Sequence, residues 1–161
     1  MPFGVNLFTY PNQPSPLMLN QLTIRNYVLV DHLDIGFAPG LTGITGESGA
    51  GKSILLGALG LLMGERARTD SVRPGADKAD VSAEFALRKD SALHQKLLTD
   101  ELIEADDDCC LVRRVVSAEG RSRAFINNVP VTVNYLKEAT EHLVDIQAVS
   151  YTHLTLPTIV R

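Results

Sequence analysis

Alternation of apolar and polar positions predicts two strands near the start of the patterned part of the chain. Leu22 and Ile24 alternate with polar neighbours, and residues 33–37 repeat the same period of two. Residues 26–31 separate the two runs and predict a turn, and residues 41–45 predict a short strand after Pro39-Gly40. The first 17 residues carry four prolines and neither period, which predicts a flexible leader over residues 1–17.

A helix is predicted after the short strand. Residues 53–63 are apolar on almost every face, as in a helix buried inside an α/β domain. Gly57 and Gly60 lower the helix propensity by roughly 1 kcal/mol each relative to Ala, but their small size permits close packing. A polar, partly basic loop follows over residues 65–78.

The rest of the pattern predicts further strands and two short helices. A strand is predicted over 81–87 and a surface helix over 91–98, followed by a β-hairpin of 111–117 and 122–127 around the turn 118–121. Thr132 is predicted to cap a helix in which Val133, Leu136, Ala139 and Leu143 share one face. Residues 144–146 predict the start of another strand.

The candidate chemistry lies between the short strand and the apolar helix. Residues 46–53 match the P-loop motif G-x-x-x-x-G-K-[ST] without substitution: Gly46, Glu47, Ser48, Gly49, Ala50, Gly51, Lys52 and Ser53. Its glycines let backbone N–H groups surround a phosphate, and the helix N-terminus adds partial positive charge. Lys52 is placed for the β- and γ-phosphates and the Ser53 hydroxyl for Mg²⁺. The motif therefore predicts binding of a nucleoside triphosphate, ATP, together with magnesium.

Hydrolysis needs more groups than this motif supplies. A P-loop ATPase also needs an acidic residue at the end of an apolar strand and a group that orients water. Asp100-Glu101 follows a segment that is predicted to be helical, and Asp145 has no second acid beside it. The sequence thus predicts half of a catalytic site.

Composition narrows the setting. With a net charge of −4, the chain lacks the overall positive charge that attracts nucleic acid, so any DNA contact must come from a local basic patch. The longest apolar run, residues 54–63, is about half of a membrane-spanning helix, and no signal peptide is recognisable. The adjacent Cys109 and Cys110 suit neither a disulfide framework nor a CxxC site, which favours a reducing cytoplasm.

A longer resemblance gives the P-loop a context. Nine segments resemble, in consistent order, the start of the RecN family of bacterial DNA repair proteins, which are SMC-like ATPases with an ABC-type head. These segments are 22–27, 30–35, 39–41, 46–53, 72–77, 81–85, 113–115, 119–127 and 143–146. The resemblance covers about residues 18–147. It implies an α/β fold with α+β layers: the N-terminal lobe of a P-loop ATPase head, with an antiparallel β layer beside the P-loop core.

The resemblance also implies partners. In this family the head is assembled from both ends of a long chain, and a missing C-terminal lobe would supply the signature motif, the magnesium-binding Asp and the catalytic Glu. The resemblance further implies that two heads form a homodimer driven by ATP and that the protein acts on DNA double-strand breaks. It also implies a location in the cytoplasm, at the nucleoid, and no membrane partner. Gly57 departs from the family, whose members carry an acidic residue there, and the match stops before the expected His-Gly-Gln at Gln147.

Two groups of arginines are candidates for phosphate contacts. SMC-like heads place a functional arginine in the loop after the P-loop helix, and the candidates for nucleotide or DNA phosphate are Arg25, Arg66, Arg68 and Arg73. The hairpin carries Arg113, Arg114, Arg121 and Arg123, a predicted basic cluster for the DNA backbone. The alternative for both groups is charge that serves only solvation. His32, His94 and His142 show no ligand spacing and are predicted to be structural.

The last fourteen residues break the pattern of the preceding chain. Residues 148–161 resemble the in-frame translation of a transposase-end sequencing adaptor, so we expect this tail to be non-native and the natural sequence to be interrupted near Gln147. The alternative is a natural divergent tail.

Other function classes remain open from the sequence. An ABC transporter ATPase subunit would share the P-loop, and a long heptad region downstream would favour the repair protein instead. A small P-loop kinase would need a lid-like arginine cluster, which we do not find. A structural remnant would not bind ATP.

Overall fold

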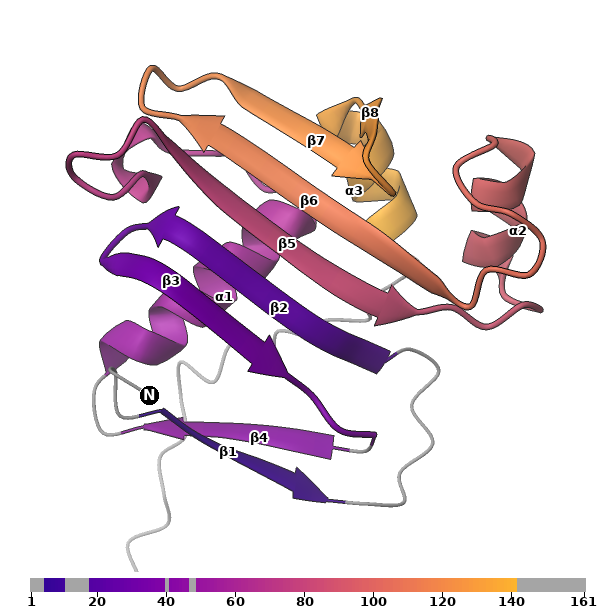
Figure 1. The fold of residues 1–161 in the computed structure, drawn as a ribbon, viewed down its shortest axis with the longest axis horizontal. Helices are drawn as coiled ribbons and strands as arrows, with labels where there is room; N and C mark the ends of the chain where they lie inside the picture. Colours follow the sequence, from indigo (N-terminus) through magenta and orange to yellow (C-terminus); the bar gives the residue numbers. More distant parts are fainter. Residues whose placement is uncertain (1–4, 11–17, 40, 47–48, 142–161) are drawn as a thin grey trace, which may run out of the picture.

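The computed structural model describes the backbone of residues 5–10, 18–39, 41–46 and 49–141, and the side chains of residues 19–39 and 51–141. The described segments form a six-stranded antiparallel sheet, a two-stranded pair and three α-helices (Figure 1). The larger sheet has the order β3-β2-β5-β6-β7-β8, and β1 pairs with β4. This arrangement is the mixed α/β lobe expected from the sequence.

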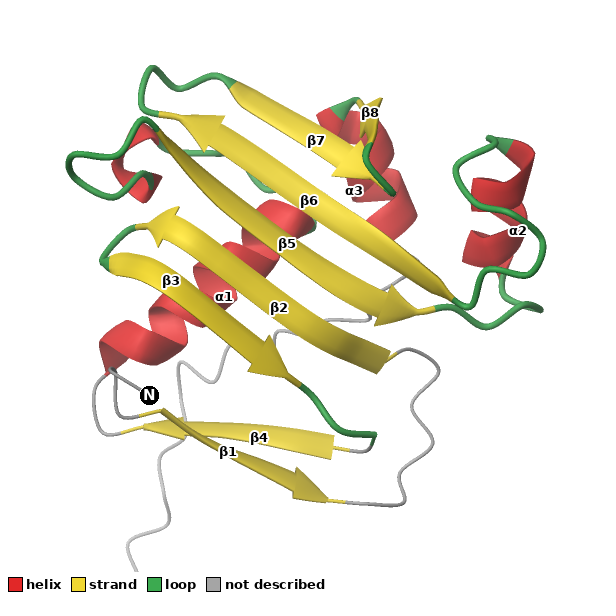
Figure 2. Cartoon of the chain, in the orientation of Figure 1, coloured by secondary structure: helices red, strands yellow, loops and turns green. Residues whose placement is uncertain are grey.

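The bounds of the elements follow the chain. They are β1 Val5–Tyr10, β2 Met18–Tyr27, β3 Val30–Gly36, β4 Leu41–Gly46, α1 Gly49–Leu62, the 3₁₀ turn η1 Thr69–Ser71, β5 Lys78–Ala86, α2 Ala92–Thr99, β6 Cys109–Ser117, β7 Ser122–Ile126, β8 Val129–Val131 and α3 Val133–Glu141 (Figure 2).

Strict alternation in β5 and β6 divides the large sheet into an inner and an outer face. Every second residue from Ala79 to Phe85 and from Cys110 to Val116 is buried, and the residues between are half-buried. Helix α1 lies behind this sheet and contacts β2, β5 and β6, whereas α3 contacts β7 (Figure 1). The core is therefore the layer between the inner face and these helices.

The central register is regular. Residues Lys78–Ala86 of β5 pair with Ser117–Cys109 of β6 without a break, and Val112–Val116 of β6 pair with Ile126–Ser122 of β7. The predicted hairpin is confirmed, as are the strands around the turn after Tyr27 and the helices that follow Ser91 and Thr132. Ser91 Oγ accepts from the His94 N–H at 3.1 Å, and Thr132 Oγ1 accepts from the Tyr135 N–H at 3.1 Å.

Two strands were not predicted. Val5–Tyr10 forms β1 inside the segment expected to be a flexible leader, where it pairs with β4 in antiparallel register from Val5↔Gly46 to Tyr10↔Leu41. The short β8 pairs with β7 through a two-residue turn, Asn127-Asn128, in which both residues have positive φ (47° and 65°). Asparagine tolerates that conformation, so this dipeptide was the available signal for a hairpin.

Several sequence predictions fall outside the described residues. These are the conformation of residues 1–4 and 11–17, P-loop residues 47–48, the histidine at 142, the apolar position Leu143, the strand over 144–146, Gln147, and the non-native tail over 148–161.

Candidate functional site

The P-loop motif occupies the predicted junction of strand and helix. Strand β4 ends at Gly46 and α1 begins at Gly49, so the first turn of the helix contains Lys52. Gly51 is buried, Lys52 is half-buried and Ser53 is exposed. The expected strand and helix are therefore present on either side of residues 47–48.

The chemistry of this first turn suits an anion. The first backbone N–H groups of a helix have no partner within it, and they lie at the positive end of its dipole. The first turn of α1 contains no acidic residue. The Lys52 ammonium adds a further hydrogen-bond donor, and the Ser53 hydroxyl adds an oxygen ligand for a cation. Together these groups fit a phosphate with Mg²⁺.

Helix α1 is held against the sheet by a close contact at Gly57. A Cβ added at Gly57 would come within 2.6 Å of the Tyr27 hydroxyl oxygen, so the missing side chain makes room for the tyrosine. Tyr27 is buried at 6% exposure, and this burial raises its pKa. The glycine thus permits the close approach of helix and sheet that the sequence suggested.

The loop after α1 is anchored to the turn between β2 and β3. The Val28 N–H donates to the Ser71 carbonyl at 2.8 Å, and the Arg73 N–H donates to the Asn26 carbonyl at 2.9 Å. The Arg73 guanidinium lies 3.3 Å from Asp31. Arg73 is therefore fixed beside the β2–β3 turn by its backbone and by an exposed ion pair.

The other candidate arginines of this group lie in different surroundings. Arg66 and Arg68 are exposed, and Arg68 binds Asp70 through two hydrogen bonds of 3.0 and 2.8 Å. Arg25 is exposed and sits opposite His32 and Asp80 in the register of β2, on the face of the sheet away from α1. The structure thus does not bring Arg25 together with Arg66 and Arg68.

The predicted basic cluster on the hairpin is wrong as a single surface. Arg114 is only 1% exposed and points into the core side, because it shares the inner face with Val112 and Val116. Its Nη1 donates to the Leu61 carbonyl at 3.0 Å, and its Nη2 donates to Ser122 Oγ at 2.5 Å. Strand alternation therefore removes Arg114 from any exposed cluster.

The remaining hairpin arginines have separate partners. Arg113 binds both carboxylate oxygens of Asp80, at 2.9 and 2.5 Å, and its guanidinium lies 5.6 Å from the centre of the Phe125 ring. Arg121 pairs with Glu119 at 3.3 Å in the turn. Arg123 is exposed and lies opposite Val115 on the outer face of the sheet.

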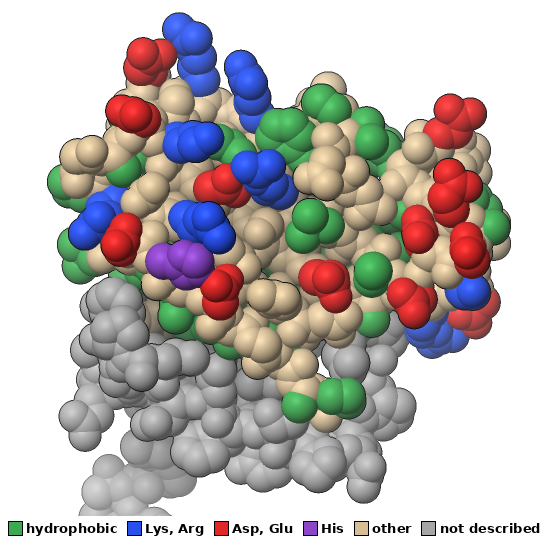
Figure 3. Space-filling view, viewed as in Figure 1, with side chains coloured by type: hydrophobic (Ala, Val, Ile, Leu, Met, Phe, Trp, Pro, Cys, Tyr) green, Lys and Arg blue, Asp and Glu red, His purple; other side chains and the backbone are tan. Residues whose placement is uncertain are grey.

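The outer face of the sheet carries charges of both signs (Figure 3). Acidic side chains dominate the end where α2 lies, as the sequence of residues 100–108 implies. On β3, at the other edge of the sheet, His32 Nε2 lies 2.5 Å from the Asp34 carboxylate, and the hydrogen bond from Thr23 lowers the pKa of Asp34. This face is thus not uniformly basic, in line with the net charge.

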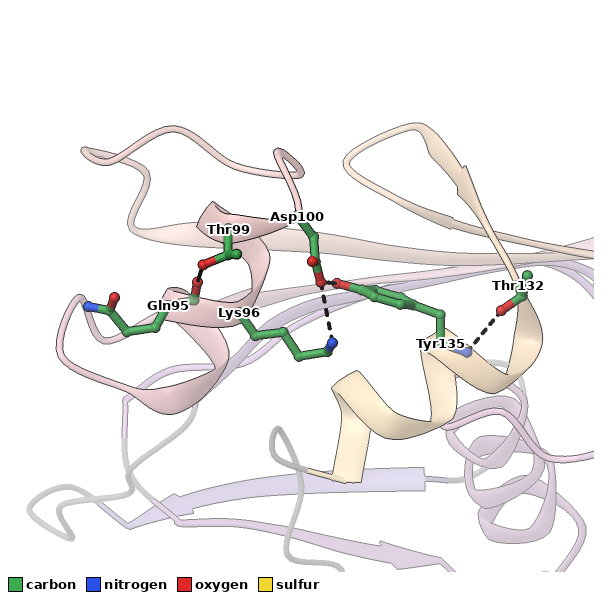
Figure 4. A network of polar contacts seen from close by, with 6 residues as sticks. All are labelled: Gln95, Lys96, Thr99, Asp100, Thr132 and Tyr135. Atoms are coloured by element: carbon green, nitrogen blue, oxygen red, sulfur yellow. Dashed lines mark hydrogen bonds and ion pairs between the residues drawn. The ribbon is translucent and has the colours of Figure 1, made fainter.

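A network of polar contacts joins α2 to α3 (Figure 4). The Tyr135 hydroxyl donates to the Asp100 carboxylate, which the Lys96 ammonium also approaches at 3.3 Å. Lys96 Nζ lies 4.6 Å from the centre of the Tyr135 ring. Asp100 and Glu101 directly follow α2, as predicted, and the Asp100 carboxylate is engaged by Tyr135 and Lys96.

Among the residues with described side chains, no group of three His, Cys, Asp or Glu could hold a metal ion. His94 is 3% exposed, in keeping with the structural role predicted for it. No helix within the described part of the chain is long and apolar enough to cross a membrane.

Comparison with known proteins places this geometry in a family. Residues 21–156 match the family described as AAA domain. The chain is 44% identical over 140 residues to the DNA repair protein RecN of Haemophilus influenzae, and 36% identical over 129 residues to RecN of Bacillus subtilis. These matches cover 86% and 80% of the chain but 25% and 22% of the relatives, so the chain spans about a quarter of their length.

Solved structures share the fold at low sequence identity. One comes from work on ATP-driven dimerization and DNA-stimulated activation of SMC ATPases, with a TM-score of 0.61, 21% identity, and 78% of each chain covered. The recombination mediator protein RecF in complex with a nucleotide has a TM-score of 0.55 at 17% identity, over 75% of this chain and 30% of RecF. The sequence resemblance to RecN and the predicted ATPase-head lobe are thereby confirmed. The chain belongs to the AAA domain family, within which it is similar to the RecN DNA repair proteins.

Proposed function

We propose that this chain binds ATP and Mg²⁺ through residues 46–53, as the nucleotide-binding lobe of a RecN-like protein that acts in the repair of DNA double-strand breaks. The observation that carries the proposal is the intact P-loop motif, Gly46 to Ser53, which runs from the end of β4 into the first turns of α1 in a chain 44% identical to RecN over 140 residues. The similarity to RecN supports the role in DNA repair, and the P-loop motif supports ATP with Mg²⁺ as the ligand.

The residues of the loop have distinct roles in this proposal. The backbone N–H groups at the start of α1 bind the β-phosphate, the Lys52 ammonium neutralises the β- and γ-phosphates, and the Ser53 hydroxyl is a ligand of Mg²⁺. The bound ion supplies charge neutralisation of the phosphates. Gly57 and Tyr27 act indirectly, because they set the position of α1 against the sheet.

Turnover of ATP requires groups beyond this lobe. We propose that residues 18–147 form the lobe, and that a C-terminal lobe supplies the magnesium-binding Asp, the catalytic Glu and the signature motif. The complete head would then pair with a second head and act on DNA in the cytoplasm, at the nucleoid. In this scheme residues 1–17 are a leader that contributes β1, and residues 148–161 are a non-native tail.

A fluorescent ATP analogue tests the binding proposal. The chain should bind it in the presence of Mg²⁺, and Lys52→Ala should weaken binding about tenfold or more, because contacts to charged groups contribute about 1.5–3 kcal/mol. Lys89→Ala is the matched control, since Lys89 is an exposed lysine in the loop between β5 and α2. No binding by the unmodified chain, or equal weakening by both substitutions, would contradict the proposal.

A further inference from the structure

Arg114 is a charged residue at a core position of the sheet. It is 1% exposed and lies between Val112 and Val116 on the inner face of β6. Burial lowers the pKa of its guanidinium, because the core disfavours the charged form. Among the described side chains Arg114 forms no ion pair. Uncharged groups therefore stabilise this cation, and they show what it does in the fold.

The guanidinium joins the end of α1 to the β6–β7 hairpin. Its Nη1 donates to the Leu61 carbonyl at 3.0 Å, and its Nη2 donates to Ser122 Oγ at 2.5 Å. Leu61 lies in the last turn of α1, where carbonyls lack an N–H partner from a following turn and the helix dipole is negative. A buried cation at this point therefore stabilises α1 and fixes where its carboxyl end lies against the sheet.

Two further contacts hold the same half of the helix. A Cβ added at Gly57 would come within 2.6 Å of the Tyr27 hydroxyl oxygen on β2, and one added at Gly64 would lie 3.0 Å from the Lys137 Cα on α3. Gly64 has a φ of +85° and ends the helix. The carboxyl-terminal half of α1 is thus fixed against β2, α3 and, through Arg114, β6.

The proposed phosphate site lies at the opposite end of this helix. Lys52 is in the first turn of α1, nine residues before Leu61, which is roughly 14 Å along the helix axis. A helix packed tightly on a core transmits a displacement of one end to the other. The two ends are also coupled electrostatically, because a phosphate at the amino end and a cation at the carboxyl end both interact favourably with the same helix dipole.

We propose that Arg114 is a positioning residue for nucleotide binding. It holds the carboxyl end of α1 so that Lys52 and Ser53, at the amino end, lie where the phosphates and Mg²⁺ bind. This inference rests on the function proposed above, and Arg114 acts through the helix without touching the nucleotide. Ser122 supports it, because its hydroxyl oxygen fixes the second arm of the guanidinium.

Calorimetric titration with MgATP compares the unmodified chain with substituted chains, each checked by circular dichroism to be folded. Arg114→Met, which removes the charge and the donors, should weaken binding about fivefold. Arg114→Lys should restore most of the affinity, because an ammonium group can still donate to the Leu61 carbonyl. Leu97→Ala is the matched control, since Leu97 is fully buried in α2, which lies apart from α1 (Figure 1). This substitution should lower stability and leave the affinity unchanged.

A milder variant decides the question if Arg114→Met does not fold. Ser122→Ala removes only the acceptor of Nη2 and should weaken MgATP binding about twofold. The inference is overturned if MgATP binds the folded variants of Arg114 and Ser122 as tightly as the unmodified chain, or if Leu97→Ala weakens binding as much as they do.

The position of α1 is also measured without nucleotide, from the amide resonances of residues 51–53 in NMR spectra. These resonances should move in the folded variants of Arg114 and Ser122 and stay in place in Leu97→Ala. If they move while the unmodified chain fails to bind MgATP, the proposed function is wrong and the positioning role of Arg114 stands. If they stay in place in the variants of Arg114 and Ser122, the inference is overturned.

Discussion

The contact between Gly57 and Tyr27 gives a quantitative test of how α1 is held. In Gly57→Ala the new Cβ would lie 2.6 Å from the tyrosine hydroxyl, which is 0.8 Å less than the 3.4 Å at which ordinary contact begins. Relief requires movement of a buried ring or of the helix itself. Overpacking of this kind costs about 1–3 kcal/mol.

The same substitution carries an opposing gain. Alanine is the better helix former by about 1 kcal/mol, so the net destabilisation by Gly57→Ala should be about 0–2 kcal/mol. In Tyr27→Phe the hydroxyl is absent, and the nearest remaining atom is the ring carbon Cζ at 3.7 Å. Gly57→Ala should then be neutral or stabilising. The expected coupling between the two positions is therefore about 1–3 kcal/mol.

Urea unfolding of four chains measures this coupling. The chains are the unmodified protein, each single variant and the double variant, and the free energy of unfolding is compared around the cycle. Equal effects of Gly57→Ala in both backgrounds would refute the reasoning, because they would show that the tyrosine hydroxyl does not limit the approach of α1.

Three further predictions concern other parts of the lobe. Burial and the hydrogen bond to Asp100 raise the pKa of Tyr135 above its ordinary 10.0, so the folded state favours the neutral phenol. The stability that this preference contributes is lost as the pH rises above 10.0. Tyr135→Phe should therefore make the fall of Tm above pH 10.0 less steep than in the unmodified chain. Burial raises the pKa of Cys110 to about 12, so iodoacetamide should alkylate the half-buried Cys109 first in the native chain and both thiols after unfolding; mass spectrometry showing Cys110 modified first would contradict this. Leu136→Ala, at a fully buried position of α3, should cost about 2–5 kcal/mol in urea unfolding, and a cost below 1 kcal/mol would contradict its place in the core.

Periodicity was sufficient for much of this fold. The period of two in residues 22–24 and 33–37 predicts β2 and β3, and the P-loop motif between the short strand over 41–45 and the apolar helix predicts the junction of β4 and α1. These features are local, because each depends on neighbours within a few residues.

The errors came from features that depend on tertiary structure. Arg114 lies two residues from Val112 and from Val116 on the same strand, so strand parity places it in the core. Its charge suggested the surface instead, and only the distant Leu61 and Ser122 provide the partners that make burial possible. Strand β1 is similar, because it pairs with β4 more than thirty residues away.

The central claim is that residues 46–53 bind ATP with Mg²⁺, and calorimetric titration of the chain with MgATP tests it most directly. The account predicts saturable binding at a single site, with affinity reduced about tenfold or more by Lys52→Ala and reduced when EDTA removes the magnesium. Absence of binding, or equal affinity in the unmodified chain and the Lys52→Ala variant, would contradict the account.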